Sequence, residues 1–292
     1  MQGRFDRAAE DLGNIVHLEH VNTRVPDQRL ATIFYISGLG LTRDPYLMTG
    51  TDNMWANIGR SQFHLPTGKP EVLRGVTGLV LPDRAALLRR LAAIRDPLAG
   101  TDFDFREEVE HVLVTSPWGN RVRVHVPDPR FGPISLGIPY VAFDVPRETA
   151  EAITRFYREV FATPATLEEG GEGKRARVMV GADQFLLFEE TDRSPPPFDG
   201  HHIAIYIANF SAPHHWLRQR NLVTEESDQH QWRFEQIVDP VDSRPLFTIQ
   251  HEVRSMRHPF CNRHLVNRDP AQTNRNYAPE HESWRWAMTS VF

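Results

Sequence analysis

The chain has 292 residues, of which 40% are hydrophobic, and it carries a formal net charge of −5 with a pI of about 6.3. This length suffices for one large domain or for two domains of about 150 residues each. The negative net charge excludes a basic surface that would bind nucleic acid. No run of consecutive apolar residues reaches the ~18 residues that a membrane-spanning helix needs. We therefore expect a cytoplasmic globular protein whose partners are neither nucleic acids nor membranes.

Four segments share one pattern, in which a strand of alternating apolar residues is followed by a polar break and a helix. They begin at His20, Val76, Tyr140 and His202, which lie 56, 64 and 62 residues apart. Apolar residues at every second position indicate strands that pack one face on a helix and leave the other face free. Room for further strands follows each helix. The sequence thus predicts an α+β fold of four βαβββ units.

The four units are predicted to form two tandem pairs. The first module spans residues 15–127 and the second spans 138–255, with a connection rich in proline and glycine between them. Residues 256–292 form an arginine-rich tail without helical or strand periodicity. Such a tail can fold over a site as a lid or wrap the outside of the sheets.

The repeated βαβββ order carries a family likeness. The first strand reads HLEHVNTRV, the first helix ends in FYISGLGL, and the second unit ends in SPWGNRVRVHV. Together these motifs resemble the vicinal oxygen chelate superfamily, which includes glyoxalase I, the extradiol dioxygenases and the bleomycin resistance proteins. The resemblance covers roughly residues 15–255. It implies cupped, barrel-like sheets in which the first and last strands of paired units hold a divalent metal on the concave face.

Carried over to this chain, the ligand positions of the first and fourth units hold three imidazoles. These are His20, His64 and His202. The corresponding residues of the second and third units are not metal ligands; they are Val76, Arg123, Tyr140 and Leu186. Pairing the first unit with the fourth would give one complete site, whereas consecutive pairing would give two half-sites. The sequence therefore favours the exchanged pairing.

The last predicted strand, LFTIQHEV at residues 246–253, should supply the fourth ligand. Alternation places Gln250 and Glu252 on the site face and His251 on the other face. Glu252 adds a neutralising charge, Gln250 lies nearer the expected position, and a β-bulge would bring in His251 instead. Glu252 and Gln250 are also the candidate catalytic residues. The candidate substrate contacts on the inner faces are Tyr206, Asn22 and Arg24.

A site of imidazoles and one carboxylate suits a divalent transition metal such as Fe, Mn, Zn, Ni or Co. The resemblance then implies a lyase, isomerase or dioxygenase that acts on a small oxygenated organic molecule. Single half-buried histidines more often form hydrogen bonds within a core, so a metal-free binding or resistance-type protein is the alternative. A homodimer is compatible with either function.

Overall fold

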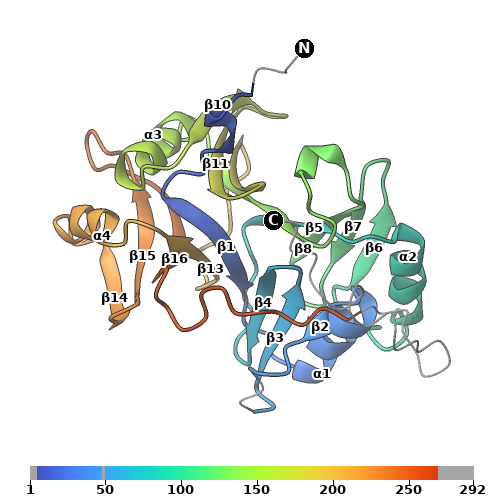
Figure 1. Cartoon of the computed structure of the whole chain (residues 1–292). Helices are drawn as coiled ribbons and strands as arrows, with labels where there is room; N and C mark the ends of the chain where they lie inside the picture. The colour runs from blue at the N-terminus through green and yellow to red at the C-terminus, as the bar shows by residue number, and fades with distance from the viewer. Residues whose placement is uncertain (1–4, 48–49, 269–292) are drawn as a thin grey trace.

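The computed structural model describes residues 5–47 and 50–268, and it contains four βαβββ units in succession (Figure 1). The first unit comprises β1 (Ile15–Asn22), α1 (Gln28–Ala31) continuing into the π-helix η2 (Thr32–Gly38), β2 (Thr42–Arg43), β3 (Asn53–Ile58) and β4 (Ser61–Pro66). The second comprises β5 (Gly75–Val80), α2 (Arg84–Ala93), β6 (Asp104–Glu107), β7 (Val112–Thr115) and β8 (Arg121–His125). The third comprises β9 (Gly137–Pro146), α3 (Ala150–Val160), β10 (Ala165–Glu169), β11 (Lys174–Gly181) and β12 (Gln184–Thr191). The fourth comprises β13 (His202–Ile207), α4 (Ser211–Arg218), β14 (Val223–Asp228), β15 (Gln231–Val238) and β16 (Pro245–Ser255). Short 3-10 helices lie at η1 (Ala8–Glu10) and η3 (Pro129–Phe131).

The strands form two eight-stranded sheets, and each sheet joins units that are distant in the sequence. The first sheet has the order β14-β15-β16-β13-β1-β4-β3-β2, so it pairs the fourth unit with the first. The second has the order β10-β11-β12-β9-β5-β8-β7-β6, which pairs the third unit with the second. This confirms the exchanged pairing. The ranges 15–127 and 138–255 divide the chain into repeats, whereas each sheet takes strands from both ranges.

Helices cover one face of each sheet, which we term the outer face, and the opposite face is the inner face. The alternating apolar residues of β13 lie on the outer face, where Ile203, Ile205 and Ile207 are fully buried. Helix α3 contacts both sheets, since it packs on β11 of the second sheet and on β15 of the first. The buried apolar residues form one continuous core. The polar residues of the strands are thereby left to the inner faces.

Local sequence signals set the helix ends. Asp27 begins α1 and Asp83 begins α2, and in each case the carboxylate accepts hydrogen bonds from backbone N–H groups of the first turn. The helical segment of the first unit ends at Gly38, as the SGLGL motif predicts. A side chain at Gly38 would collide with Ile94, so this glycine also allows α2 to approach η2 closely.

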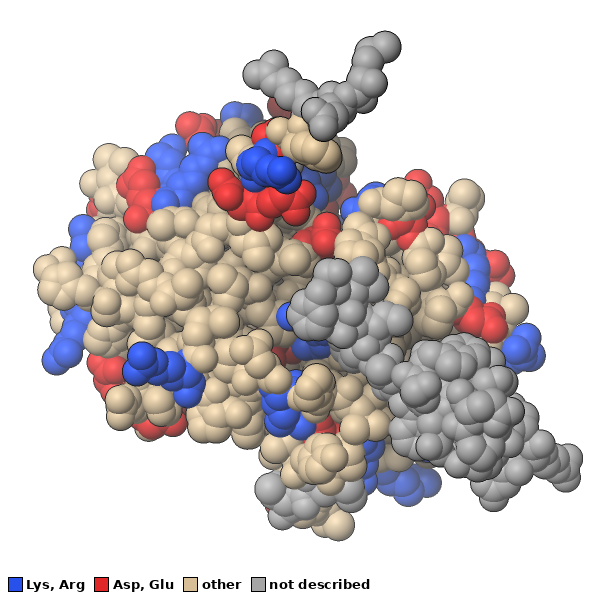
Figure 2. All heavy atoms as spheres, viewed as in Figure 1, with Lys and Arg blue, Asp and Glu red and all other residues tan. Residues whose placement is uncertain are grey.

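Charges of both signs are mixed on the surface. Figure 2 shows lysine and arginine side chains next to aspartate and glutamate side chains around the margin of the visible face, in the part that the structure describes. None of the described helices is long and apolar enough to cross a membrane.

Candidate metal centre

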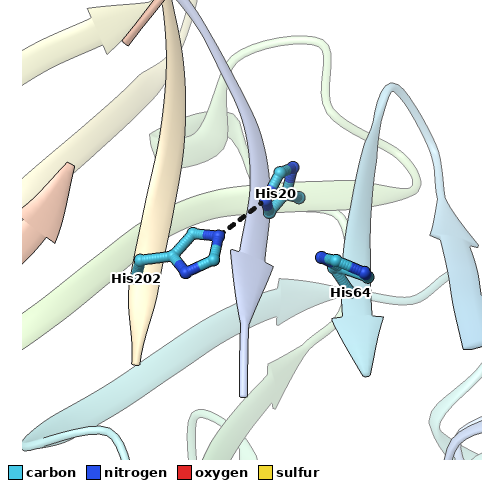
Figure 3. A group of neighbouring side chains, drawn as sticks. All are labelled: His20, His64 and His202. Atoms are coloured by element: carbon cyan, nitrogen blue, oxygen red, sulfur yellow. Dashed lines mark hydrogen bonds between the residues drawn. The ribbon is translucent and has the colours of Figure 1, made fainter. Parts of the chain in front are cut away.

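Three histidines from three neighbouring strands meet on the inner face of the first sheet (Figure 3). His20 lies on the middle strand β1, His64 on β4 and His202 on β13. The strand registers explain the meeting: Asn22 of β1 pairs with His64 on one side and with His202 on the other, and His20 lies two residues before it on the same face. One possible ligand atom from each histidine lies within 4.8 Å of the others.

The spacing of two of these atoms fits a metal ion. Two atoms bonded to one ion at about 2.1 Å are about 3.0 to 3.5 Å apart. The Nε2 atoms of His20 and His202 are 3.3 Å apart. The Nε2 atom of His64 is buried and has no hydrogen-bond partner. A buried polar atom without a partner costs about 1–3 kcal/mol, and a metal bond would offset that cost.

Burial keeps two of these imidazoles neutral. It lowers the pKa of His64 to about 2 and that of His202 well below its ordinary value, and the charge of His20 adds to both shifts. Both side chains are therefore unprotonated near pH 7. The neutral imidazole is the form that binds a metal.

Glu252 is the counterpart of His64 in the fourth unit. His64 pairs with Asn22, two residues after His20, and Glu252 pairs with Ala204, two residues after His202. One Glu252 oxygen lies 3.5 Å from the Nε2 atom of His202. The carboxylate is also held by two guanidinium groups, at 2.5 Å from Arg233 and at 2.5 Å from Arg254. Glu252 thus borders the three histidines and at the same time belongs to a buried ion-pair network.

The neighbours of Glu252 in β16 divide between the two faces as alternation predicts. Gln250 lies on the inner face, where its side chain bonds Arg233 at 3.2 Å and Glu235 at 3.2 Å. His251 is fully buried on the outer face, where its Nε2 atom is 2.7 Å from the Tyr157 hydroxyl. The ladder between β15 and β16 shifts register between His251 and Thr248, but this irregularity does not turn His251 to the site, so the choice lies between Gln250 and Glu252.

The three predicted substrate contacts have different surroundings. Asn22 is buried between the histidines, and its Oδ1 atom has no hydrogen-bond partner. Tyr206 is buried on the same face, where it pairs in register with Arg254. Arg24 lies beyond the end of β1 and forms an ion pair with Glu71 at 2.6 Å. Its role as a substrate contact stays a prediction.

A buried carboxylate that the sequence did not indicate supports His20. The Glu19 carboxylate accepts a hydrogen bond from Nδ1 of His20 at 2.5 Å and another from the Arg254 guanidinium at 2.7 Å. Strict alternation would place Glu19 on the outer face, but a β-bulge interrupts β1 at this residue. Leu18 pairs with Ile205 and His20 pairs with Ala204, so β1 advances by two residues where β13 advances by one. Burial raises the pKa of Glu19, but the charges of His20 and Arg254 outweigh it and lower the pKa to about 2.

Comparison with known proteins gives matches in structure alone. No protein-family model matches the chain, and no curated protein matches its sequence. Glyoxalase I from Zea mays matches with a TM-score of 0.54 and 12% identity, over 82% of this chain and 92% of that chain. A Bacillus subtilis protein named for an expected dioxygenase activity matches with a TM-score of 0.54 and 15% identity, over 86% and 88% of the two chains. The chain has the vicinal oxygen chelate fold.

Within this fold, the segment after β16 crosses the inner face of the first sheet (Figure 1). We term residues 256–268 the strap. Its Phe260 ring lies 6.4 Å from the Trp55 ring, which in turn stacks on His64 at 3.8 Å. Arg263 of the strap bonds Asp44 at 2.9 Å and Gln62 at 3.3 Å.

The strap continues toward the edge of the sheet. Asn57 of β3 donates to the carbonyl of Val266, and the side chain of Asn267 bonds both backbone groups of Gly59. Because Asn57 pairs with Gln62 and Gln62 pairs with His20, these contacts lie on the histidine face. Of the two expectations for the tail, the described part agrees with a cover over the site. Residues 269–292 lie outside the described residues.

The second sheet has no comparable centre. Among the residues that the structure describes, the three histidines are the one group with metal-binding spacing. In the register of the second sheet, Val76, Arg123 and Tyr140 take the places of His20, His64 and His202. The counterpart of Glu252 is Leu187, which pairs with Ala142, and the prediction of Leu186 is wrong by one residue. Leu186 faces the core instead.

Proposed function

We propose that this protein is a metal-dependent enzyme of the vicinal oxygen chelate type. It would hold a divalent transition metal with His20, His64, His202 and Glu252 and act on a small oxygenated organic molecule as a lyase, isomerase or dioxygenase. The observation that carries the proposal is the convergence within 4.8 Å of three imidazoles, two of them buried and the third, that of His64, half-buried with an unpartnered Nε2 atom. A cytoplasmic location and a homodimer remain part of the proposal.

The ion and the residues around the three histidines would have separate roles. When bound, the ion would supply Lewis acidity toward two neighbouring oxygens of the substrate. Asn22 offers a free amide oxygen beside the histidines, and its position suits an O–H or N–H donor of the substrate. Gln250 and Glu252 are the candidate catalytic residues because both lie on this face beside His202. An amide does not accept a proton, so Gln250 would orient the substrate, and Glu252 would be the proton acceptor.

The surroundings of the site favour chemistry away from bulk water. Trp55 stacks on His64, and the strap brings Phe260 against Trp55. Low exposure strengthens electrostatic interactions between the bound substrate and the charged groups of the site. The strap would therefore limit access to substrates that are small enough to fit beside Trp55.

The alternative is a metal-free binding protein, and one observation favours it. Both oxygens of Glu252 already have guanidinium partners in Arg233 and Arg254. In that case the histidines would serve as hydrogen-bonding groups for a ligand.

Metal analysis of protein purified without a histidine tag separates the two functions. We expect a stoichiometric transition metal by inductively coupled plasma mass spectrometry, and its loss from His20→Ala and His202→Ala. His125→Ala is the matched control, because His125 is a buried histidine of the second sheet. Protein without metal, even after incubation with each candidate ion, would support the metal-free function and contradict the proposal.

A further inference from the structure

The inner face of the second sheet presents a guanidinium group where the first sheet presents a histidine. Arg123 takes the register position of His64. Gly78 of the central strand pairs with Arg123 on one side and with Tyr140 on the other, so these residues lie in one row across the sheet. A side chain at Gly78 would collide with the Tyr140 ring, which shows that this ring lies over the glycine, toward Arg123.

Arg123 differs from the other arginines of this face in having no acidic partner. Arg121 pairs with Asp144 at 3.3 Å, and Arg175 pairs with Glu168 at 2.6 Å. Arg123 forms no ion pair with a carboxylate of the described residues, and its polar neighbour is the Tyr140 hydroxyl. A guanidinium without a counter-ion on an inner face is a point of attraction for an anion.

Glu108 and Glu110, which lie on the loop before β7, have ion-pair partners other than Arg123. Glu108 pairs with Arg106 at 2.7 Å and with His111 at 3.1 Å. Glu110 pairs with Arg130 at 2.8 Å. The hydrogen bond from Arg106 lowers the pKa of Glu108 and the charge of Arg123 adds to this shift, but neither carboxylate forms an ion pair with Arg123.

Apolar groups flank Arg123 within the same row. Leu113 pairs with it in register on the far side, and Phe185 pairs with Tyr140 on the near side. All four side chains are half-buried, so solvent and small solutes reach them. The hydroxyl of Tyr140 is fixed by the Nε2 atom of His125 at 2.9 Å. The row therefore combines the Arg123 guanidinium with apolar and aromatic side chains. A second guanidinium, that of Arg177, lies 3.6 Å from the centre of the Phe185 ring and pairs with Glu168 at 3.8 Å.

We propose that this row binds a small organic carboxylate with an aromatic or apolar body. The planar guanidinium of Arg123 would hold the carboxylate through two parallel hydrogen bonds, and the rings of Tyr140 and Phe185 would contact the body. The site is separate from the three histidines, and its existence does not depend on the metal proposal.

Titration with benzoate tests the site, followed by NMR chemical shifts or calorimetry on the full chain. We expect benzoate to bind, and Arg123→Gln to weaken binding by about tenfold or more, because a charge-assisted hydrogen-bonded pair is lost. Benzamide, which has the same ring but no charge, should bind at least about tenfold more weakly than benzoate on the same ground.

Two variants serve as controls. Arg121→Gln removes a neighbouring arginine that is already paired, and His20→Ala removes a residue of the first sheet; both should leave benzoate binding unchanged. Absent binding, equal weakening by Arg121→Gln, or loss of binding in His20→Ala would overturn the proposal. Inorganic phosphate binding at Arg123 as tightly as benzoate would overturn the assigned ligand class.

Discussion

The two inner faces of this molecule begin from the same strand arrangement and have different chemistry. In the first sheet, His20, His202 and Glu252 are at most 5% exposed, and they lie in a network of histidines and ion pairs. In the second sheet, the corresponding residues Val76, Arg123, Tyr140 and Leu187 include no metal ligand, and the last three are half-buried. The repeat therefore determines the framework, and the side chains at a few registered positions determine what each face can bind.

The coverings of the two faces differ in the same way. The strap follows the last strand of the fourth unit and forms buried contacts, including that of Arg263 with the fully buried Asp44. The connection after the second unit places Phe131 beside Tyr140, but its Arg130 pairs with Glu110 at an exposed position. In the part of the chain that the structure describes, the strap covers the first face, whereas the connection after the second unit covers the second face only in part.

The largest effect should come from the ligand histidines. We expect His202→Ala to weaken metal binding by more than about 100-fold, since loss of a direct ligand exceeds the 10-fold to 100-fold cost of losing an outer partner. Competition with a chromogenic chelator measures the affinity. The second sheet provides the contrast, because Tyr140→Ala, at the corresponding position, should leave the affinity unchanged. An equal loss in both variants would show that the two faces do not differ in this way.

The next effect concerns the stability of the ion network in metal-free protein. Glu252→Gln should lower the free energy of unfolding by about 1–3 kcal/mol, because Arg233 and Arg254 would each lose one carboxylate partner and keep only Glu225 and Glu19, respectively. Arg121→Gln, which breaks the half-exposed pair with Asp144 in the second sheet, should lower it by less than about 1 kcal/mol. Urea denaturation in the presence of a chelator measures both. Similar losses would argue against the burial difference between the faces.

Replacing the buried carboxylate behind His20 should have a smaller effect. We expect Glu19→Gln to weaken metal binding by about 10-fold to 100-fold, because the partner that orients the imidazole is altered. Glu235→Gln is the control, as Glu235 bonds Gln250 and has no contact with a histidine ligand. Glu19→Gln with unchanged affinity would show that the bulge in β1 has no role in holding His20.

The smallest effect is expected at the covering of the first face. Arg263→Gln should reduce the hydrogen-exchange protection of residues 256–268 by about tenfold, since the local opening free energy falls by about 1 kcal/mol when the ion pair with Asp44 is lost. Arg130→Gln in the connection of the second sheet should change exchange much less. Unchanged protection of the strap would mean that its apolar contacts alone hold it in place.

The sequence predicted the framework well because alternation and repetition leave visible patterns. Four βαβββ units and their exchanged pairing were predicted from the repeat spacing and from the distribution of ligand-type residues, and both are confirmed. Alternation also placed His251 on the outer face correctly, because β16 keeps an unbroken register with β13 from Gln250 to Ser255.

The remaining details depend on features that do not alter the pattern of residue types. The bulge that turns Glu19 inward adds one residue to β1 without changing the alternation that is seen in the sequence. The prediction of Leu186 failed for a related reason: the register of β12 against β9 is set by pairing across strands. The strap has no periodicity, so its place on the inner face follows from tertiary contacts such as that of Arg263 with Asp44.

The most direct test of the central claim is anomalous scattering from crystals of protein loaded with a transition metal. The proposal predicts a peak within about 2.0–2.2 Å of nitrogen atoms of His20, His64 and His202, with a Glu252 oxygen at a similar distance. No peak at these residues in crystals of protein that carries stoichiometric metal, or a peak at another place in the molecule, would contradict it.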